Sequence, residues 1–346
     1  MGRLLFFDAT LRDGSHAIKH QLTSNQIEDY CQCMDGSGVH TIIVGHGNGL
    51  GASSIQVGLS LLDERTMLRT AKKNLSTTKL GAYMIPGFGT IEDNLIPAIN
   101  DGVDVFKIGC HCTEADTTRQ HIEYLRKSDK EVYGVLMMTH MISPEKLLEE
   151  CLKMQSYGAL GVILMDSAGA YTPEMVKRNI SLLVNNVNIR IGFHPHNNMG
   201  LAVSNAYTAI LSGATIIDGT VRGFGAGAGN CQLEDIIALL EKENIDTGVD
   251  LYKLLDCSEK VMPTIMKKEM GQDSISIISG KAGVFSAFKN QAIKAGIEYN
   301  VDPRDILIEV GKRRAVAGQE DMIIEVAKEL SNSHDDDTSY QLGSLL

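Results

Sequence analysis

The chain has 346 residues, 43% of them hydrophobic, and a formal net charge of −11. This length fits one large domain of about 250–300 residues with an appendage. The acidic balance argues against a nucleic-acid partner, and because the sequence has neither an apolar run of about 18 residues nor a secretory signal, we expect no membrane span and no export.

Short apolar, β-branched runs recur along the first 225 residues, and amphipathic segments separate them. The runs cover residues 4–10, 40–46, 79–85, 103–110, 131–138, 161–167, 190–196 and 215–221. The amphipathic segments, expected to be helices, cover residues 24–38, 62–74, 91–101, 117–128, 144–157, 173–186 and 200–212. Strands that alternate with helices predict a parallel sheet buried on both faces. Eight such units predict the α/β class and a closed TIM (β/α)8 barrel.

An open, doubly wound sheet is the alternative fold, but no Gly-x-Gly-x-x-Gly follows the first strand. After about residue 232 the strand pattern fades. Helical patterns then cover residues 233–243, 250–270, 284–296, 303–312 and 319–331. We therefore predict a barrel domain over residues 1–245, a helical C-terminal subdomain over 246–331 and a disordered tail over 332–346.

Polar and ionisable residues gather where the predicted strands end, which is the catalytic face of a TIM barrel. Residues 8–16 read Asp-Ala-Thr-Leu-Arg-Asp-Gly-Ser-His, and residues 194–197 read His-Pro-His-Asn. Residues i and i+2 of a strand point to the same face, so His194 and His196 can reach one ion. Asp13 can join them, because the first and seventh strands of a closed barrel are separated only by the eighth.

One carboxylate and two neutral imidazoles leave about half of an octahedral metal shell open. A chelating 2-oxo acid would fill it; Mn²⁺ or Mg²⁺ suits such an oxygen-rich shell, and Zn²⁺ or Co²⁺ could also bind. The ion would act as a Lewis acid on the enolate formed beside the oxo group. Arg12 is the candidate for holding the developing oxyanion, and His16 is the candidate general base. Taken alone, Arg12 and Asp13 could form a surface ion pair, and His194 and His196 could be polar residues at a strand end. Only the convergence of the two stretches favours catalysis.

Two further motifs leave alternatives open. The glycine-rich run at 222–230 could cradle a phosphate, although we favour close packing against the metal site, with Asn230 as a hydrogen-bond partner or extra ligand. The run Cys110-His111-Cys112 could bind a metal, although a buried strand end is favoured. The seven cysteines form no CxxC pair, which predicts reduced thiols in a cytoplasmic protein.

These motifs resemble those of a known superfamily. The Asp-x-Thr-Leu-Arg-Asp-Gly start, the His-x-His strand end and the Gly-Ala-Gly-Asn loop are similar to those of the metal-dependent barrels that include pyruvate carboxylase, isopropylmalate synthase and hydroxymethylglutaryl lyase. Longer stretches look like the 4-hydroxy-2-oxovalerate aldolase family, and the likeness runs from about residue 4 to 331. These stretches lie at 15–21, 111–116, 120–124, 136–140 and 318–322.

The resemblance implies a class II aldolase that cleaves a 4-hydroxy-2-oxo acid, such as 4-hydroxy-2-oxopentanoate, to pyruvate and an aldehyde such as acetaldehyde. It implies a divalent metal, usually Mn²⁺, and a heterotetramer-type complex with an acylating acetaldehyde dehydrogenase; a homo-oligomer is the alternative. The resemblance implies that Asp13, His194 and His196 bind the metal. It implies that Arg12 stabilises the transition state and that His16 is the base. It also implies that Ser167 contacts the substrate. Arg12, Asp13 and His194 would also contact the substrate.

The predicted C-terminal helix at 319–331 carries an apolar stripe of Met322, Ile323, Val326 and Leu330. Such a stripe suits docking of a partner. Packing of the stripe inside the protein itself is equally compatible with the pattern.

This sequence departs from the family pattern at two positions. A tyrosine that faces the substrate in the family's Gly-Val-Tyr-Ser-Ser-Phe stretch is here Phe285, and a leucine of the aldehyde pocket in Leu-Leu-Leu-Pro-Gly is here Tyr83. We therefore expect an intact pyruvate half of the site and a rewritten aldehyde half. The alternatives are a paralogous aldolase that uses another aldehyde in a biosynthetic pathway rather than in aromatic degradation, a Claisen-type acyl-CoA condensing enzyme of the same superfamily, and a non-catalytic scaffold.

Overall fold

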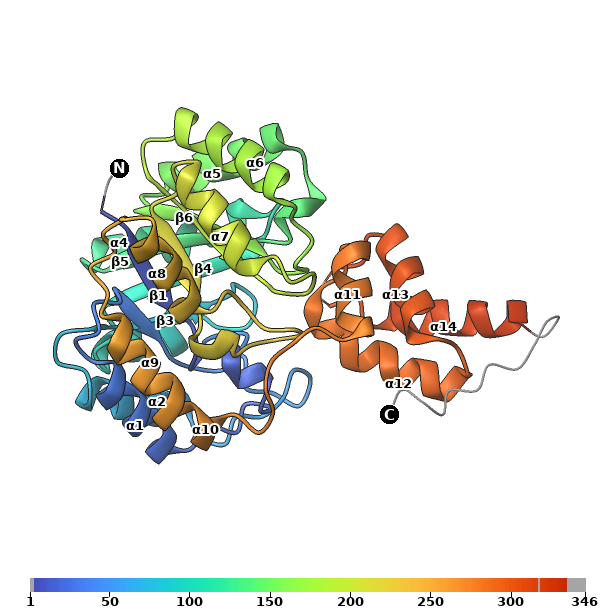
Figure 1. Ribbon diagram of the computed structural model, residues 1–346, viewed down its shortest axis with the longest axis horizontal. Coiled ribbons are helices and arrows are strands. Elements are labelled where there is room, and N and C mark those ends of the chain that lie inside the picture. The colour runs from blue at the N-terminus through green and yellow to red at the C-terminus, as the bar shows by residue number, and fades with distance from the viewer. Residues whose placement is uncertain (1–2, 317, 335–346) are drawn as a thin grey trace.

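The computed structural model describes residues 3–316 and 318–334. Eight parallel strands form a closed barrel in the order β1-β2-β3-β4-β5-β6-β7-β8, which confirms the predicted TIM barrel (Figure 1). The strands are β1 (Leu5–Asp8), β2 (Thr41–Ile43), β3 (Lys79–Met84), β4 (Val105–His111), β5 (Glu131–Met137), β6 (Gly161–Asp166), β7 (Arg190–Pro195) and β8 (Ile216–Gly219). The first and last strands close the barrel by pairing Phe7 with Asp218.

Helices surround the barrel, and many of them begin at a side-chain cap. They are α1 (Ser24–Met34), α2 (Glu64–Lys73), α3 (Ile96–Asn100), α4 (Arg119–Lys127), α5 (Pro144–Ser156), α6 (Pro173–Asn186), α7 (Ala202–Leu211) and α8 (Leu233–Lys242). Thr23 and Gln26 form a capping box at the start of α1. Ser143 and Thr172 cap α5 and α6, each just before a proline. These caps start the helices where the sequence pattern places them.

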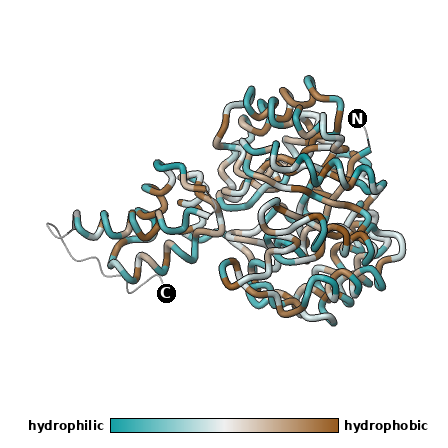
Figure 2. Tube along the Cα trace, turned by 180° about the vertical axis from the view of Figure 1, so that it is seen from behind, coloured by the Kyte–Doolittle hydropathy of each residue, from teal (hydrophilic) through white to brown (hydrophobic). Residues whose placement is uncertain are grey.

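Side chains fill the barrel interior, so it is a packed core and not a pore. The apolar ones are Phe7, Ile43, Tyr83, Val105, Tyr133, Val135, Ile163, Met165 and Ile216. Lys107 from β4 and Asp218 from β8 lie among them, fully buried and ion-paired. A larger apolar layer separates the strands from the helices. In Figure 2, hydrophobic and hydrophilic residues alternate along the surrounding helices, as expected of helices with one buried face.

Six helices follow the barrel. They are α9 (Leu251–Lys260), α10 (Met262–Ile265), α11 (Ser274–Ala282), α12 (Lys289–Tyr299), α13 (Pro303–Lys312) and α14 (Asp321–His334). Of these, α9 contacts α1 and α8, and α10 contacts α1. The later four share a separate hydrophobic cluster and form a distinct body beside the barrel (Figure 1). Because α9 and α10 contact barrel helices, we propose a division between α10 and α11 in place of the expected boundary after residue 245.

The sequence pattern does not indicate α11. Its buried face is mostly small or polar, with Ser276, Ser279 and Gly280 beside Ile275, so no apolar stripe marks the helix. Asp273 caps its start, and Gly283 ends it in a left-handed conformation. The helix expected over 284–296 begins later, at Lys289, because the chain first turns through residues 283–288.

The apolar stripe of α14 packs within the C-terminal helices. Ile323 and Val326 are fully buried in their cluster, and Met322 and Leu330 pack against it. The docking interpretation of this stripe is therefore wrong. The predicted tail also begins too early, because residues 332–334 belong to α14; its remainder, residues 335–346, lies outside the described residues. Within the described ranges, no helix has both the length and the apolar character needed to cross a membrane.

Candidate active site

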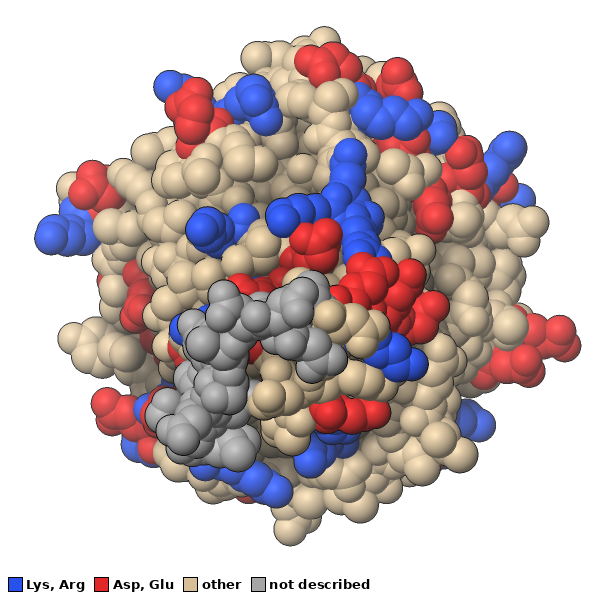
Figure 3. All heavy atoms as spheres, turned by 90° about the vertical axis from the view of Figure 1, so that its right-hand side faces the viewer, with Lys and Arg blue, Asp and Glu red and all other residues tan. Residues whose placement is uncertain are grey.

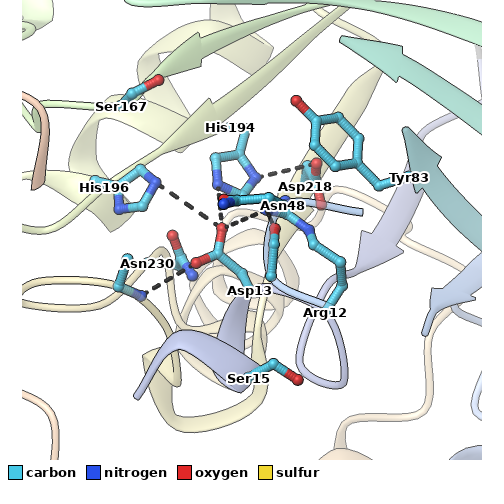
Figure 4. A network of polar contacts seen from close by, with 12 residues as sticks. Arg12, Asp13, Ser15, Asn48, Tyr83, Ser167, His194, His196, Asp218 and Asn230 are labelled. Atoms are coloured by element: carbon cyan, nitrogen blue, oxygen red, sulfur yellow. Dashed lines mark hydrogen bonds and ion pairs between the residues drawn. The ribbon is translucent and has the colours of Figure 1, made fainter. Parts of the chain in front are cut away.

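The three predicted metal ligands meet at the mouth of the barrel (Figure 4). Asp13 begins a short 3₁₀ helix, η1 (Asp13–His16), directly after β1; His194 lies near the end of β7, and His196 follows that strand. The Nε2 atoms of His194 and His196 lie 3.4 and 4.0 Å from Oδ2 of Asp13, and all three side chains are buried. Their candidate ligand atoms lie within 4.8 Å of one another, so one ion could bind all three.

The carboxylate of Asp13 is held in its charged form. Burial alone would raise its pKa, but the Arg12 guanidinium, 3.0 Å away, and the two imidazoles hold the pKa well below its usual range. Its other oxygen, Oδ1, accepts a hydrogen bond of 3.1 Å from the backbone amide of Ala226. A charged carboxylate is the form that binds a metal.

The glycine-rich run packs against this carboxylate, as the favoured interpretation predicts. A Cβ atom on Gly225 would lie 2.1 Å from Nδ2 of Asn230 and 3.1 Å from Oδ1 of Asp13, so only glycine fits there. Asn230 lies beside Asp13 in Figure 4, and in the described part of the chain its buried Oδ1 has no hydrogen-bond partner. Asn230 is thus placed to contact an ion or a bound ligand.

Arg12 presents unused hydrogen-bond donors to the site. Its Nη1 donates to the backbone oxygen of Gly47 at 3.2 Å, and its guanidinium carbon lies 4.7 Å from the ring centre of Tyr83. Such a stacked, buried cation is stabilised by about 2 kcal/mol. Its Nε and Nη2 atoms are buried without partners among residues 3–316 and 318–334. Buried donors without partners are costly, and a bound anion would satisfy them.

His16 ends η1 and is the outermost of three packed imidazoles. A Cβ atom on Gly47 would lie 2.4 Å from His16 Nε2, so the ring rests on the backbone of the loop after β2. The ring of His20 lies 5.2 Å from that of His16, and the ring of His46 stacks on His20 at 3.6 Å. Burial lowers the pKa of His16, and it lowers the pKa of His20 to about 3 and that of His46 to about 4. All three rings are therefore neutral at pH 7.

Tyr83 points into the mouth of the barrel, beside Arg12 (Figure 4). Its hydroxyl donates to the sulfur of Met137 at 3.3 Å. Gly109 on the neighbouring strand makes room, because a Cβ atom there would lie 2.1 Å from the Tyr83 hydroxyl oxygen. Burial raises the pKa of this phenol above its usual value, so the hydroxyl stays protonated.

Ser167 lies on another side of the mouth (Figure 4), and Phe285 packs against the hydrophobic cluster of the C-terminal helices. The Ser167 hydroxyl accepts a hydrogen bond of 3.2 Å from the backbone amide of Met138, and Figure 4 shows it apart from the metal ligands. Ser286 joins it to the C-terminal helices, since both its backbone amide and its hydroxyl donate to the Ser167 carbonyl oxygen, at 3.1 and 2.8 Å. Phe285 is half-buried against Phe288, with ring centres 5.9 Å apart.

The C-terminal helices rest on loops from the second half of the barrel. His140, after β5, lies 2.9 Å through its Nε2 from the carbonyl oxygen of Gly283. Gln272, just before α11, donates to the carbonyl oxygen of Asn197, after β7, at 3.0 Å. Together with Ser286 on Ser167, these contacts place α11 and the turn after it beside the active-site mouth.

Comparison with known proteins decides the family. The HMGL-like family matches residues 3–261, and the DmpG-like communication domain matches residues 270–332. The chain is 49% identical to the 4-hydroxy-2-oxovalerate aldolase of Pectobacterium atrosepticum, over 96% of this chain and 97% of that protein. It is 50% identical to the 4-hydroxy-2-oxovalerate aldolase of Spirochaeta aurantia, over 94% and 95%. The chain belongs to the 4-hydroxy-2-oxovalerate aldolase family.

This membership confirms the resemblance drawn from the motifs and makes the protein a carbon–carbon lyase. Solved structures share the fold of this aldolase. The HMG-CoA lyase of Brucella melitensis has a TM-score of 0.67 at 15% identity, over 78% of this chain and 100% of that one. The carboxyl transferase domain of Rhizobium etli pyruvate carboxylase has a TM-score of 0.79 at 15% identity, over 96% of this chain and 60% of that one. The gap between the two family matches, residues 262–269, contains α10 and the chain that leads to α11, so it is compatible with a division after α10.

In this aldolase, Tyr83→Leu and Phe285→Tyr, made singly and together, are expected to change the preferred aldehyde or C4 configuration. A site that hydrogen-bonds a substrate hydroxyl discriminates better than one that depends on apolar fit, so a shift of about 10-fold or more in relative kcat/KM is expected. Competition assays with both C4 configurations and several chain lengths measure it. Tyr133→Leu is the matched control, since that hydroxyl faces Glu131 at the start of β5. Unchanged preferences in all variants would contradict a rewritten aldehyde pocket.

Proposed function

We propose that this protein cleaves 4-hydroxy-2-oxopentanoate, or a close analogue, to pyruvate and an aldehyde such as acetaldehyde by a retro-aldol reaction. The observation that carries this proposal is the convergence of Asp13, His194 and His196 beside a buried arginine with two unpartnered N–H groups. Family membership supports the same reaction.

Asp13, His194 and His196 would hold the divalent ion, for which we propose Mn²⁺, with Mg²⁺, Co²⁺ or Zn²⁺ as alternatives. The buried, unpartnered Oδ1 of Asn230 beside them fits an ion or an ordered ligand. When bound, the ion supplies a Lewis acid for the 2-oxo group of the substrate.

The side chains around this site can carry the proton and charge steps. We assign His16 to accept the proton of the C4 hydroxyl, for which a neutral imidazole is required. As the C3–C4 bond breaks, its electron pair moves into an enolate, and the free N–H groups of Arg12 hold the negative charge on the C2 oxygen. The aldehyde leaves, and protonation of C3 then gives pyruvate. Ser167 would contact the substrate from the side nearest the C-terminal helices.

The formal charges match such an intermediate. Arg12 offsets Asp13, and Lys107 offsets Asp218, so these four side chains sum to zero. With these four side chains neutral in sum, a bound divalent ion would supply two positive charges, the number of negative charges on a pyruvate enolate. Charge balance of this kind favours a dianionic intermediate in a buried site.

The direct test is release of pyruvate from a series of 4-hydroxy-2-oxo acids in buffers with a single defined metal. Pyruvate and one equivalent of aldehyde are expected, with the highest kcat/KM identifying the natural aldehyde. An acetyl-CoA arm separates the condensing alternative: consumption of acetyl-CoA in the presence of a 2-oxo acid, without pyruvate release from any hydroxy acid, would replace the aldolase proposal. Turnover by neither route would favour a scaffold.

We also propose that the C-terminal helices α11–α14 bind an acylating acetaldehyde dehydrogenase, in a heterotetramer-type particle. The match of this region to a communication domain supports the pairing. The stripe of α14 is buried, so the contact must use the outer surface. On the face seen along the long axis from this end, acidic and basic side chains intermingle (Figure 3). Co-expression should give a co-purifying pair; a homo-oligomer that ignores the dehydrogenase would contradict it.

A cytoplasmic location completes the proposal. The seven cysteines are free thiols, and all but Cys33 are buried. Reduced thiols of this kind are typical of cytosolic proteins.

A further inference from the structure

A buried ion pair lies directly behind one of the metal ligands. Lys107 on β4 and Asp218 on β8 are both fully buried, and Nζ of the lysine contacts Oδ2 of the aspartate. The same Oδ2 atom lies 3.0 Å from Nδ1 of His194 (Figure 4). The three side chains thus form a row from the centre of the barrel to the metal site.

Stability alone does not explain this pair. Removing two charges from water costs several kcal/mol for each ion, and apolar residues of similar size often stabilise a core as well or better. The neighbours are apolar; the ring centre of Phe7 lies 5.9 Å from the lysine nitrogen. A charged pair kept in such surroundings needs another reason, and its contact with His194 offers one.

We propose that Lys107 and Asp218 are positioning residues for His194. The carboxylate of Asp218 accepts the Nδ1 proton of His194, which leaves the Nε2 lone pair directed at Asp13 and at an ion between them. Lys107 keeps the carboxylate in place and compensates its charge. Hydrogen bonds of this kind fix the tautomer and orientation of a metal-binding histidine.

The two histidine ligands are therefore not equivalent. Nδ1 of His194 lies 3.0 Å from Oδ2 of Asp218, whereas the ion-pair contact of His196 is made by its Nε2, which lies 4.0 Å from Oδ2 of Asp13. The amine of Lys107 contacts Asp218 behind His194, so its place fits an action through His194.

The inference rests on the proposed metal site, and metal affinity tests it without using the reaction. Mn²⁺ is titrated into the apoprotein, and free Mn²⁺ is followed by electron paramagnetic resonance. Asp218→Asn is expected to weaken Mn²⁺ binding by about 10- to 100-fold, the usual effect of removing such a partner. Lys107→Met should weaken binding in the same direction.

Asp8→Asn is the matched control. Asp8 is a buried carboxylate on the neighbouring strand β1, but it contacts Thr10 and Tyr30 and neither histidine. The affinity of the Asp8→Asn variant for Mn²⁺ should stay within about twofold of the wild type, because Asp8 shares no hydrogen bond with the candidate metal ligands. Weakening of Asp8→Asn by as much as Asp218→Asn would overturn the inference.

The outcomes separate the two proposals. If the wild type binds no divalent ion, the proposed metal chemistry fails. If the wild type binds Mn²⁺ and folded Asp218→Asn binds it equally well, with only a lower Tm, the pair is structural and the positioning role is wrong. If neither variant folds, the tautomer of His194 in the wild type decides. It is measured by NMR on protein with ¹⁵N-labelled histidine and bound Mg²⁺. The proton is expected on Nδ1, and a proton on Nε2 would overturn the inference.

Discussion

Chelation of the divalent ion is expected to abolish turnover. Without an ion at Asp13, His194 and His196, no Lewis acid stabilises the developing charge on the 2-oxo group. The transition state then loses several kcal/mol of stabilisation, which lowers the rate on the order of 10³-fold. Protein treated with EDTA and desalted should release no measurable pyruvate, and added Mn²⁺ should restore the rate. His196→Ala should abolish the response to added metal.

His111→Ala provides the comparison for His196→Ala. His111 lies at the end of β4, its Nδ1 within 3.0 Å of the Thr113 hydroxyl, and none of the metal ligands is its partner. This variant should keep both metal binding and activity. Full turnover by metal-free protein would eliminate metal-dependent cleavage.

His16→Ala is expected to lower kcat by about 10²–10⁴-fold, the usual contribution of a general base. Metal binding should be retained, because His16 is not among the three candidate ligands. His121→Ala, a change to a half-buried histidine on α4, controls for loss of an imidazole. An unchanged rate in His16→Ala would assign the base elsewhere, and loss of metal would make His16 a ligand.

The pH profile gives a second measurement of the base. A general base works only when it is deprotonated, so kcat/KM falls as the pH drops through its pKa. Burial lowers the pKa of His16 from 6.5, so the acid limb of the profile should lie below about pH 6.5 and disappear in His16→Ala.

The sequence predicts the barrel and the convergence of its candidate metal ligands because both depend on short-range patterns. Each strand is an apolar run between turns, and the i, i+2 spacing of His194 and His196 places both on one face. Asp13 then follows from barrel order alone, because β8 is the only strand between β1 and β7. The prediction of helices fails where the spacing of apolar residues shows only a weak helical period, as in α11.

Long-range contacts account for what the sequence could not show. Lys107 interrupts an apolar run, which is a visible signal, but its partner lies 111 residues away. Ser286 rests on Ser167 across 119 residues, and nothing in either stretch predicts the pairing. The imidazole stack of His20 and His46 likewise depends on how the loop after β2 folds back on η1.

The buried pair of Lys107 and Asp218 also constrains how the chain reaches its native state. Its two members sit on the fourth and the last strands, so a partial barrel of β1–β4 would hold a lysine in an apolar interior with no counter-charge. Leaving a buried charge uncompensated costs about 3–5 kcal/mol. A half-barrel that buried Lys107 would therefore be disfavoured, and the pair favours a single step in which the whole barrel closes. During synthesis, that step must wait until residue 218 has left the ribosome.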